Sequence, residues 1–528
     1  MFKFVRSITK SVFKGAKEGI KEEVKENPQF QKVIKKHPKT FHFVKRRLSK
    51  REKYGLYFST GSLIFLTATY FFAKILFGYV NHNALVSLDI RALNIVKFFR
   101  NPALNQDMFF WTNFEKWEVV VMGLVLTTIF LVYLGLRYYS YLLIISVSFG
   151  ELFVWFSKNL IERARPDFAS ALITEKGYSF PSGHAFVAMS FYGLLGYIIF
   201  SNIKRKSLKA ITLIFFTLFI LGIGFSRIYL GVHWFSDVLA SLVGGIAWIC
   251  VLVMFLKTKK RFGSPTVKEI LIPEKRDNSK NTFLLLVLLL VVWLAFAFYF
   301  FKTHSLPFNS GVTEQANDFG GVKERIVISE QDFPGKIFEN LPRVSETITG
   351  KPMEPINLIV AGSREELFSS FEKAGWFPTD RLNLKNAWRL VIKTLFNQPY
   401  GNAPGIPSLW NALPNEIGFA KPTEKNQVQE RNHLHFWETS FSLSDGRSVW
   451  IGTAHFDKTI KKTASVILPV HVIDPAIDKE RDKIKADLLL TGRVESSKEF
   501  QIVEPTLGQN QSGDMFFTDG KAEVIYLR

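Results

Sequence analysis

The sequence predicts an all-α, polytopic membrane helical bundle followed by a soluble α+β domain. Apolar runs long enough to cross a bilayer, about 20 residues each, recur between residues 54 and 301. Phenylalanine supplies 52 of the 528 residues, a high share for a soluble protein. After residue 301 the composition changes to balanced charge with frequent Pro and Gly. The chain therefore divides into a membrane part and a soluble part.

The membrane part is expected to contain seven spans, of which six form a core and the seventh leads to the soluble domain. The spans are predicted at residues 55–78, 117–136, 140–157, 184–200, 210–225, 237–256 and 283–301. The corresponding domains are a basic N-terminal segment (1–53), a membrane domain (54–256), a linker (257–282), the seventh span (283–301) and a C-terminal domain (303–528).

The distribution of charge predicts how these spans are oriented, because Lys and Arg are retained on the cytoplasmic side. Residues 1–53 carry 17 basic against 5 acidic residues, and residues 257–281 carry eight against three. The loop 201–209 adds four more basic residues. With seven alternating spans, these segments share the cytoplasmic side. We therefore expect a multi-pass membrane protein with loop 79–116 and the C-terminal domain on the outer side, which is the periplasm if the membrane is a bacterial inner membrane.

The net charge of +21 would also suit a nucleic-acid-binding protein, but its distribution excludes that class. The basic residues flank apolar spans and are not interleaved with aromatic residues as in a nucleic-acid-binding module. The bilayer is therefore the expected partner. Residues 1–27 place apolar side chains at near-helical spacing, which fits either an amphipathic helix on an anionic membrane surface or a solvated basic tail. The single cysteine, Cys250, excludes a disulfide within one chain.

Three short stretches beside the apolar runs contain residues that can bind and transfer phosphate. In the first, Lys158 and Arg165 lie seven residues apart, so a helix continuing from the third span would place both cations on one face until Pro166 ends it. The alternative is that the cations of this stretch, Lys158, Arg163 and Arg165, anchor the span among lipid headgroups.

The second stretch, Pro181-Ser182-Gly183-His184, opens the fourth span. Backbone amides at a helix start favour an anion, Ser182 can cap the helix, and Gly183 allows close approach of a phosphate. A simple helix cap followed by an incidental histidine is the alternative.

The third stretch contains Arg227, His233 and Asp237. His233 and Asp237 are four residues apart on one helical face, so the carboxylate can accept a hydrogen bond from one ring nitrogen and leave the other free to attack. Arg227 supplies a planar fork suited to phosphate oxygens. A structural histidine–aspartate pair is the alternative, but all three stretches are expected at the same membrane face.

Together, the three stretches resemble the pattern of the type 2 phosphatidic acid phosphatase superfamily, over about residues 54–256. That pattern is Lys, six residues, Arg-Pro; then Pro-Ser-Gly-His; then Ser-Arg, five residues, His, three residues, Asp, and every position is matched. The resemblance implies that His233 is the nucleophile, Asp237 its orienting partner and His184 the general acid. It assigns the binding of the phosphoryl oxygens to a further set, Lys158, Arg165, Ser182, Gly183 and Arg227.

The predicted activity is metal-independent hydrolysis of a phosphate monoester or diphosphate on a lipid headgroup, without a cofactor. Candidate substrates are phosphatidic acid, phosphatidylglycerol phosphate, undecaprenyl diphosphate and phosphorylated lipid A. One alternative is a lipid phosphotransferase that uses the same phosphohistidine. Another is a non-catalytic, lipid-binding envelope assembly factor. Within the third span, Glu151 is expected to face the bundle interior.

The C-terminal part reads as strands and helices. Residues 357–362 are predicted to form a strand, followed by a helix with Ser363 and Glu366 in capping-box spacing and a stop at Gly375. Residues 433–443 and 447–456 are predicted to pair as a hairpin through Asp445-Gly446, and 522–527 to add a last strand. The region resembles the LssY-type C-terminal domain, which implies no defined activity; a module that presents substrate or binds an envelope protein is the preferred hypothesis.

Three histidines of this region, His433, His435 and His455, fall on the two strands of the predicted hairpin. Their alternation makes a metal site conceivable. The sequence favours a structural role instead, because no clear fourth ligand accompanies them.

Overall fold

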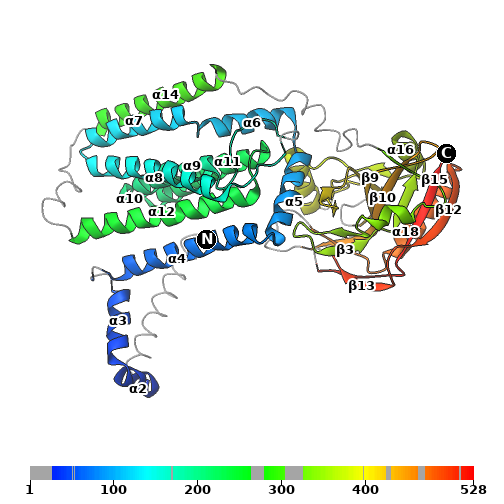
Figure 1. The fold of residues 1–528 in the computed structure, drawn as a ribbon, viewed down its shortest axis with the longest axis horizontal. Coiled ribbons are helices and arrows are strands. Elements are labelled where there is room, and N and C mark those ends of the chain that lie inside the picture. Colours follow the sequence, from blue (N-terminus) through cyan, green and yellow to red (C-terminus); the bar gives the residue numbers. More distant parts are fainter. Residues whose placement is uncertain are drawn as a thin grey trace.

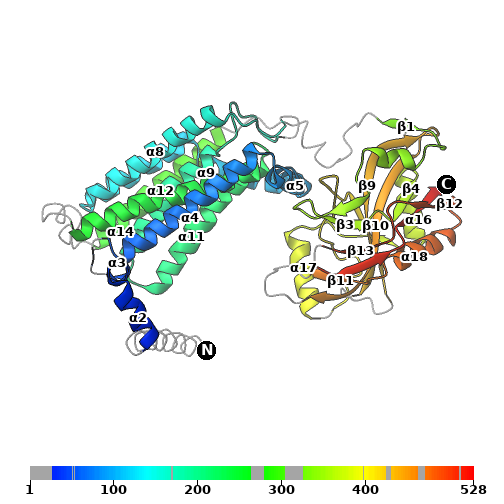
Figure 2. The same ribbon diagram turned by 60° about the horizontal axis from the view of Figure 1, so that its bottom comes forward.

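A computed structural model shows a long helical bundle and a separate mixed α+β domain joined side by side (Figures 1 and 2). The structure describes residues 27–262, 279–303 and 325–528, apart from short gaps at 50–51, 53, 168–170, 397, 424–429, 462–469 and 511–512. The predicted amphipathic segment before Pro28 lies outside the described residues. The predicted fold class, a helical membrane region followed by an α+β domain, is confirmed.

Among the described residues, six helical segments are long and apolar enough to cross a membrane. Five of them are single helices: α4 (Leu56–Val80), α8 (Arg137–Ile161), α11 (Lys206–Tyr229), α12 (Phe235–Phe262) and α14 (Ser279–Thr303). The other is the continuous segment Gly183–Asn202, which consists of α9 (Gly183–Ala188), a π-helical turn (Met189–Gly193) and α10 (Leu194–Asn202). A seventh span results if α6 (Pro102–Asn113) and α7 (Trp117–Tyr133), which are bent by 50° at their junction, count as one. The chain is therefore a multi-pass membrane protein with six or seven spans.

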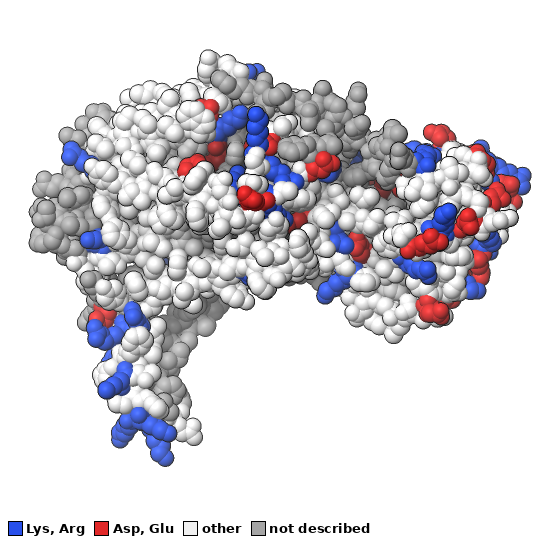
Figure 3. Space-filling view, in the orientation of Figure 1, with Lys and Arg blue, Asp and Glu red and all other residues white. Residues whose placement is uncertain are grey.

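The surface of the bundle agrees with a lipid environment. Large apolar side chains stay exposed along its helices, including Leu63 on α4, Leu213 on α11 and Leu284 on α14, which are 59–72% exposed. Figure 3 shows a largely uncharged bundle between the basic helices α2 (Pro28–Lys36) and α3 (Pro38–Leu48) and the mixed charges of the α+β domain. Such a wide apolar surface is stable only where lipid covers it.

The segment predicted as loop 79–116 is mostly helical. It forms α5 (Ala84–Phe98) and α6, and each helix starts at an asparagine whose side chain accepts a backbone N–H: Asn83 from Leu85 and Asn101 from Leu104. Asparagine is a favoured N-cap residue, and Pro102 follows the second cap in the first helical turn. The polar caps were therefore a readable signal that the segment is not an irregular loop.

The α+β domain is built on a nine-stranded sheet. Its main path runs β12-β15-β4-β10-β9-β8-β5, with β1 paired to β9 and β11 paired to β10. The strands of the path are β12 (Val494–Gln501), β15 (Lys521–Leu527), β4 (Leu358–Ala361), β10 (Ser448–Lys461), β9 (Arg431–Leu443), β8 (Ile417–Pro422) and β5 (Phe377–Pro378). The added strands are β1 (Ile326–Ile328) and β11 (Val470–Ile473). Strand β4 is completely buried and carries apolar side chains to both faces of the sheet, one cluster on each.

Smaller elements complete the domain. Three helices accompany the sheet, α16 (Arg364–Lys373), α17 (Leu384–Leu395) and α18 (Asp478–Leu489), with a 3₁₀ helix at Gly335–Glu339. A four-stranded sheet contains β3 (Pro352–Pro355), β2 (Val344–Glu346), β6 (Leu409–Trp410) and β7 (Leu413–Pro414). A two-stranded sheet pairs β13 (Thr506–Gln509) with β14 (Met515–Thr518).

The local signals of the C-terminal part are confirmed. Helix α16 starts with a complete capping box between Ser363 and Glu366, and Gly375 adopts a left-handed φ of 79° after its end. Strands β9 and β10 pair antiparallel, and Gly446 in their turn has a φ of 91°. These features depend only on neighbouring residues, so the sequence could specify them without tertiary information.

Helix α5 connects the two parts of the molecule (Figures 1 and 2). Its Arg91 forms an ion pair of 2.5 Å with Glu346 of β2, and both side chains are nearly buried. Glu346 also accepts the N–H of Ala412, whose carbonyl accepts a hydrogen bond from Asn94 at 2.9 Å. Within the described residues, polar groups of α5 therefore connect the end of the bundle to the α+β domain.

We expect Arg91→Glu to loosen this contact. Two facing carboxylates would repel, so amide hydrogen exchange in β2, β6 and β7 should rise by about tenfold, which corresponds to about 1.4 kcal/mol. The charge swap Arg91→Glu with Glu346→Arg should restore protection, and Lys498→Ala, an exposed change on β12, should leave it unaltered. Equal exchange in wild type and Arg91→Glu would show that this pair does not hold the domain.

Candidate active site

The three motif stretches meet at the end of the bundle next to α5. Lys158 lies in the last turn of α8, and the loop that follows carries Arg165. Gly183 begins the fourth apolar segment, Arg227 lies in the last turn of α11, and Asp237 in the first turn of α12. The backbone N–H of Ser182 contacts the carbonyl of Asp237 at 3.4 Å, which places the second stretch against the third.

His233 lies between a cation and a carboxylate. Its Nδ1 is 3.5 Å from Oδ2 of Asp237, and its Nε2 is 3.2 Å from Nη1 of Arg165. Both members of the histidine–aspartate pair are almost completely buried. Burial lowers the pKa of His233 well below its ordinary value, and Arg165 lowers it further. The ring is therefore neutral at pH 7 and has a lone pair available on one nitrogen.

Asp237 is held by a buried network that includes a residue from α5. Arg163 donates to Oδ1 of Asp237 at 2.5 Å and to Oδ2 of Asp89 at 2.6 Å. Asp89 in turn accepts the backbone N–H and the hydroxyl of Ser236, and Asp237 accepts the N–H of Trp234. The guanidinium lies over the Tyr79 ring, 4.5 Å from its centroid. Arg163 thus fixes the carboxylate behind His233.

Two other arginines point at one carboxylate. Glu175, in the loop between the first two motif stretches, forms ion pairs with Arg227 and, at 3.3 Å, with Arg165. Although burial opposes it, Arg227 lowers the pKa of Glu175 well below its ordinary value, with further contributions from His184, His233 and Arg165. Arg227 also donates to the hydroxyl of Thr112 on α6 at 2.6 Å. The two guanidinium groups therefore form an anion-binding position that a carboxylate fills in this structure.

The second stretch contributes a free hydroxyl and an open backbone. Ser182 is at the N-cap position, but its side chain does not cap the helix; the Oγ is buried and has no hydrogen-bond partner among the described residues. A Cβ at Gly183 would meet Val154 at an ordinary 3.4 Å, so packing against the described residues does not require the glycine. Both features fit the approach of a ligand oxygen.

One expectation about the first stretch is wrong. Helix α8 ends at Ile161, and Glu162 takes a left-handed φ of 50°, so Lys158 and Arg165 do not share a helical face. Both cations nevertheless act on His233, since each lowers its pKa. Glu151 was expected to face the bundle interior but is exposed on α8.

Sequence reasoning missed three parts of the site. Asp89 lies in the segment treated as a loop, Arg163 was seen only as a possible headgroup anchor, and Glu175 was not singled out. None is a specified position of the family pattern, although Arg163 lies within the first stretch. Asp89 is separated by 148 positions from Asp237, the other carboxylate that Arg163 binds. An acidic residue within the largely apolar stretch 84–99 was the available sequence signal for Asp89.

The assembled parts are those of a phosphoryl-transfer site. They comprise a neutral imidazole backed by a carboxylate, a second histidine, and cations that converge on an anion position. Cations placed around a transferred phosphoryl group stabilise the charge that develops on its oxygens. Because the site lies at one end of a membrane-spanning bundle, the fold and site together define an integral-membrane phosphatase.

Comparisons with known proteins agree with this class. Residues 118–261 match the family profile described as PAP2 superfamily, and residues 338–522 match the profile described as LssY C-terminus. A relative named phosphatidylglycerophosphatase B, from Bacillus subtilis (strain 168), is 30% identical over 195 residues, which are 37% of this chain and 95% of the relative. The chain belongs to the PAP2 superfamily and is a PAP2-type membrane lipid phosphate phosphatase, with an LssY C-terminal domain.

Two solved structures are also similar. The first is described as the crystal structure of the first transmembrane PAP2 type phosphatidylglycerolphosphate phosphatase from Bacillus subtilis, with 26% identity, coverage of 38% of this chain and 98% of that chain, and a TM-score of 0.36. The second is the crystal structure of Aquifex aeolicus LpxE, with 23% identity, coverage of 32% and 94%, and a TM-score of 0.27.

Removal of Arg163 should destabilise the fold. Arg163→Ala leaves two buried carboxylates without their counter-charge, which costs about 3–5 kcal/mol for a buried pair. We expect a clear drop in the thermal unfolding midpoint of the detergent-purified protein. Lys176→Ala, an exposed change in the same connecting loop, is the matched control and should unfold like wild type. The role assigned to Arg163 is wrong if both variants unfold at the same temperature.

Glu175→Gln should strengthen binding of inorganic phosphate, because the neutral amide no longer compensates the two guanidinium charges. We expect the inhibition constant of orthophosphate to fall by about tenfold. Since the pKa of Glu175 lies well below its ordinary value, the wild-type carboxylate stays charged between about pH 5 and 8, and the difference should persist across that window. Weaker inhibition of the variant would show that the carboxylate does not compete with phosphate.

Proposed function

We propose that this protein hydrolyses a phosphate monoester or diphosphate on a lipid headgroup through a phosphohistidine formed on His233. The observation that carries the proposal is the position of that ring. Its Nδ1 faces Asp237, and its Nε2 faces Arg165, one of the two arginines that converge on the anion position. A phosphate that replaced the Glu175 carboxylate would meet both guanidinium groups beside Nε2.

The reaction follows from this geometry in two steps. Nε2 of His233 attacks phosphorus, the bond from phosphorus to the leaving oxygen breaks, and His184 protonates that oxygen. Water then attacks the phosphohistidine, gives its proton to His184, and orthophosphate leaves. Asp237 keeps the Nδ1 proton in place throughout and stabilises the positive charge on the ring. Arg165, Arg227 and Lys158 neutralise the phosphoryl oxygens, together with the Ser182 hydroxyl and the Gly183 amide.

The proposed location is a bacterial inner membrane, with the N-terminus in the cytoplasm and the site in the periplasm. The basic helices α2 and α3 lie at the end of the bundle away from α5, the site and the α+β domain (Figure 1). Retention of basic segments in the cytoplasm would then put the site at the outer leaflet. Lipid phosphates of that leaflet are the substrates within reach, and the α+β domain could present them or bind an envelope protein.

The decisive measurement is phosphate release from the four candidate lipids by purified protein in detergent. Phosphatidylglycerol phosphate is the first to test, because a relative is named for it. We expect His233→Ala to abolish turnover and phosphate labelling of the protein. His184→Ala should lower turnover by about 10²–10⁴-fold for a monoester. The loss should be smaller for a diphosphate, whose leaving phosphate needs less protonation. His82→Ala, an exposed histidine outside the site, is the control.

The same assay separates the competing functions. A phosphorylated acceptor lipid in place of free orthophosphate would indicate a phosphotransferase. No turnover of any candidate lipid by wild type, with the C-terminal domain still binding an envelope protein, would favour an assembly factor. Full activity in His233→Ala would overturn the proposed nucleophile.

A further inference from the structure

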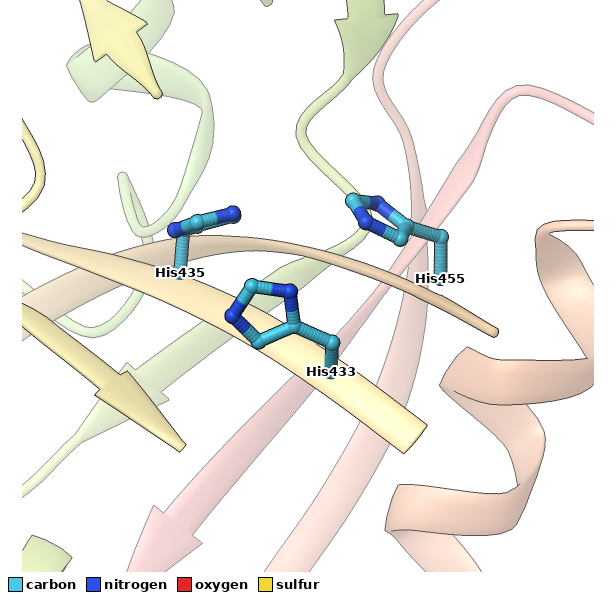
Figure 4. Close-up of side chains that lie close together, drawn as sticks. All are labelled: His433, His435 and His455. Carbon is cyan, nitrogen blue, oxygen red and sulfur yellow. The ribbon is translucent and has the colours of Figure 1, made fainter. Parts of the chain in front are cut away.

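Three histidines gather on one face of the large sheet, far along the chain from the phosphatase site. His433 and His435 alternate on β9, and His455 lies directly opposite His433 on β10. Alternate residues of a strand, and directly paired residues of two strands, project to the same face of a sheet. Figure 4 shows the three rings turned toward a common space, and one ring nitrogen from each lies within 4.8 Å of the others.

A carboxylate lies behind two of the rings. Asp457 on β10 is 3.6 Å from Nδ1 of His433 through Oδ2 and 3.5 Å from Nε2 of His455 through Oδ1. Its charge is balanced by Arg431, whose Nε is 3.1 Å away, and both side chains are about 1% exposed. Metal-binding histidines commonly direct their second nitrogen to such a carboxylate, which fixes the tautomer and the ring orientation. The other ring nitrogens, Nε2 of His433 and Nδ1 of His455, then face the common space.

Two ring nitrogens of the cluster have no other role in the described structure. The Nδ1 atoms of His435 and His455 are buried and have no hydrogen-bond partner among the described residues. An unsatisfied buried polar atom costs about 1–3 kcal/mol. A purely structural histidine cluster leaves this cost unexplained, whereas a bound cation removes it.

The surroundings leave space next to the cluster. A Cβ at Gly405 would come within 3.0 Å of Nε2 of His433, so only a glycine keeps the loop clear of that nitrogen. His433 and His435 also line a cavity of about 170 Å³, whose wall includes Arg364, Arg381 and, from the membrane part, Phe98. A ligand entering this cavity could reach the histidines directly.

We propose that His433, His435 and His455 form a binding site for one divalent transition-metal ion, with a fourth coordination position open to the cavity. Imidazole ligands favour zinc over magnesium or calcium, and three histidines with an open position are typical of an exchangeable rather than a closed structural site. Ligand nitrogens around zinc lie about 2.0–2.1 Å from the ion, so binding would draw the three rings slightly together. The cavity wall carries Arg364 and Arg381 but also Asp380 and Glu416, so a neutral water suits the fourth position.

The test measures metal directly on the full-length protein. Wild type in detergent is stripped with a chelator, reloaded with Zn²⁺, freed of unbound ion and analysed for zinc content; Co²⁺ loading then reports tetrahedral coordination through its visible absorption. We expect about one ion per chain in wild type and in two controls, His82→Ala and His233→Ala. The second control removes the phosphatase nucleophile, so the readout does not depend on turnover.

The ligand and carboxylate variants make the test specific. His435→Ala and His455→Ala should lose the stoichiometric ion and the cobalt spectrum. Asp457→Asn should keep the spectrum but bind about 10–100-fold more weakly. Wild type that retains no more metal than His435→Ala would overturn the proposal, and this result holds even if a variant folds poorly. Loss of the ion in His233→Ala alone would place the metal at the membrane site and equally refute it.

Discussion

The phosphatase site depends on one buried guanidinium. Arg163 forms ion pairs with two carboxylates, Asp237 and Asp89. Asp237 lies behind His233, the proposed nucleophile, and Asp89 extends from α5 to accept the backbone N–H of Ser236 at the start of α12. Two carboxylates and one guanidinium are stable away from water only when every oxygen is also hydrogen-bonded. Ser236 and Trp234 supply those additional donors from the start of α12. The network therefore sets the relative positions of α5, the loop after α8, and α12.

Helix α5 also contacts the α+β domain. Asp89 and Arg91 lie two positions apart on α5; the first reaches into the phosphatase site and the second binds the domain through Glu346. A short helix thus takes part in both the site and the interface. Any shift of the domain against the bundle would move the helix that supports Asp237. Helix α5 thus contacts both the membrane site and the LssY C-terminal domain.

The two candidate sites neutralise anions by different chemistry. In the membrane site the chain supplies fixed cations, and Glu175 occupies their focus. In the sheet, the cluster consists of three imidazoles, and the nearby Asp457 is already compensated by Arg431. Positive charge at the second site would come from a bound ion. Because Phe98 of α5 lines the cavity beside the histidines, that cavity lies on the side of the domain that faces α5.

The sequence by itself determined the membrane spans, the motif residues and the local features of the domain. Apolar length, capping boxes such as that of Ser363, and turns such as that of Gly446 depend on neighbouring residues. The tertiary structure alone decided that Lys158 and Arg165 do not share a helical face, because α8 ends at Ile161, between them. It also supplied Asp89, Arg163 and Glu175, since a buried charge selects its partner by distance in space, which no spacing along the chain encodes.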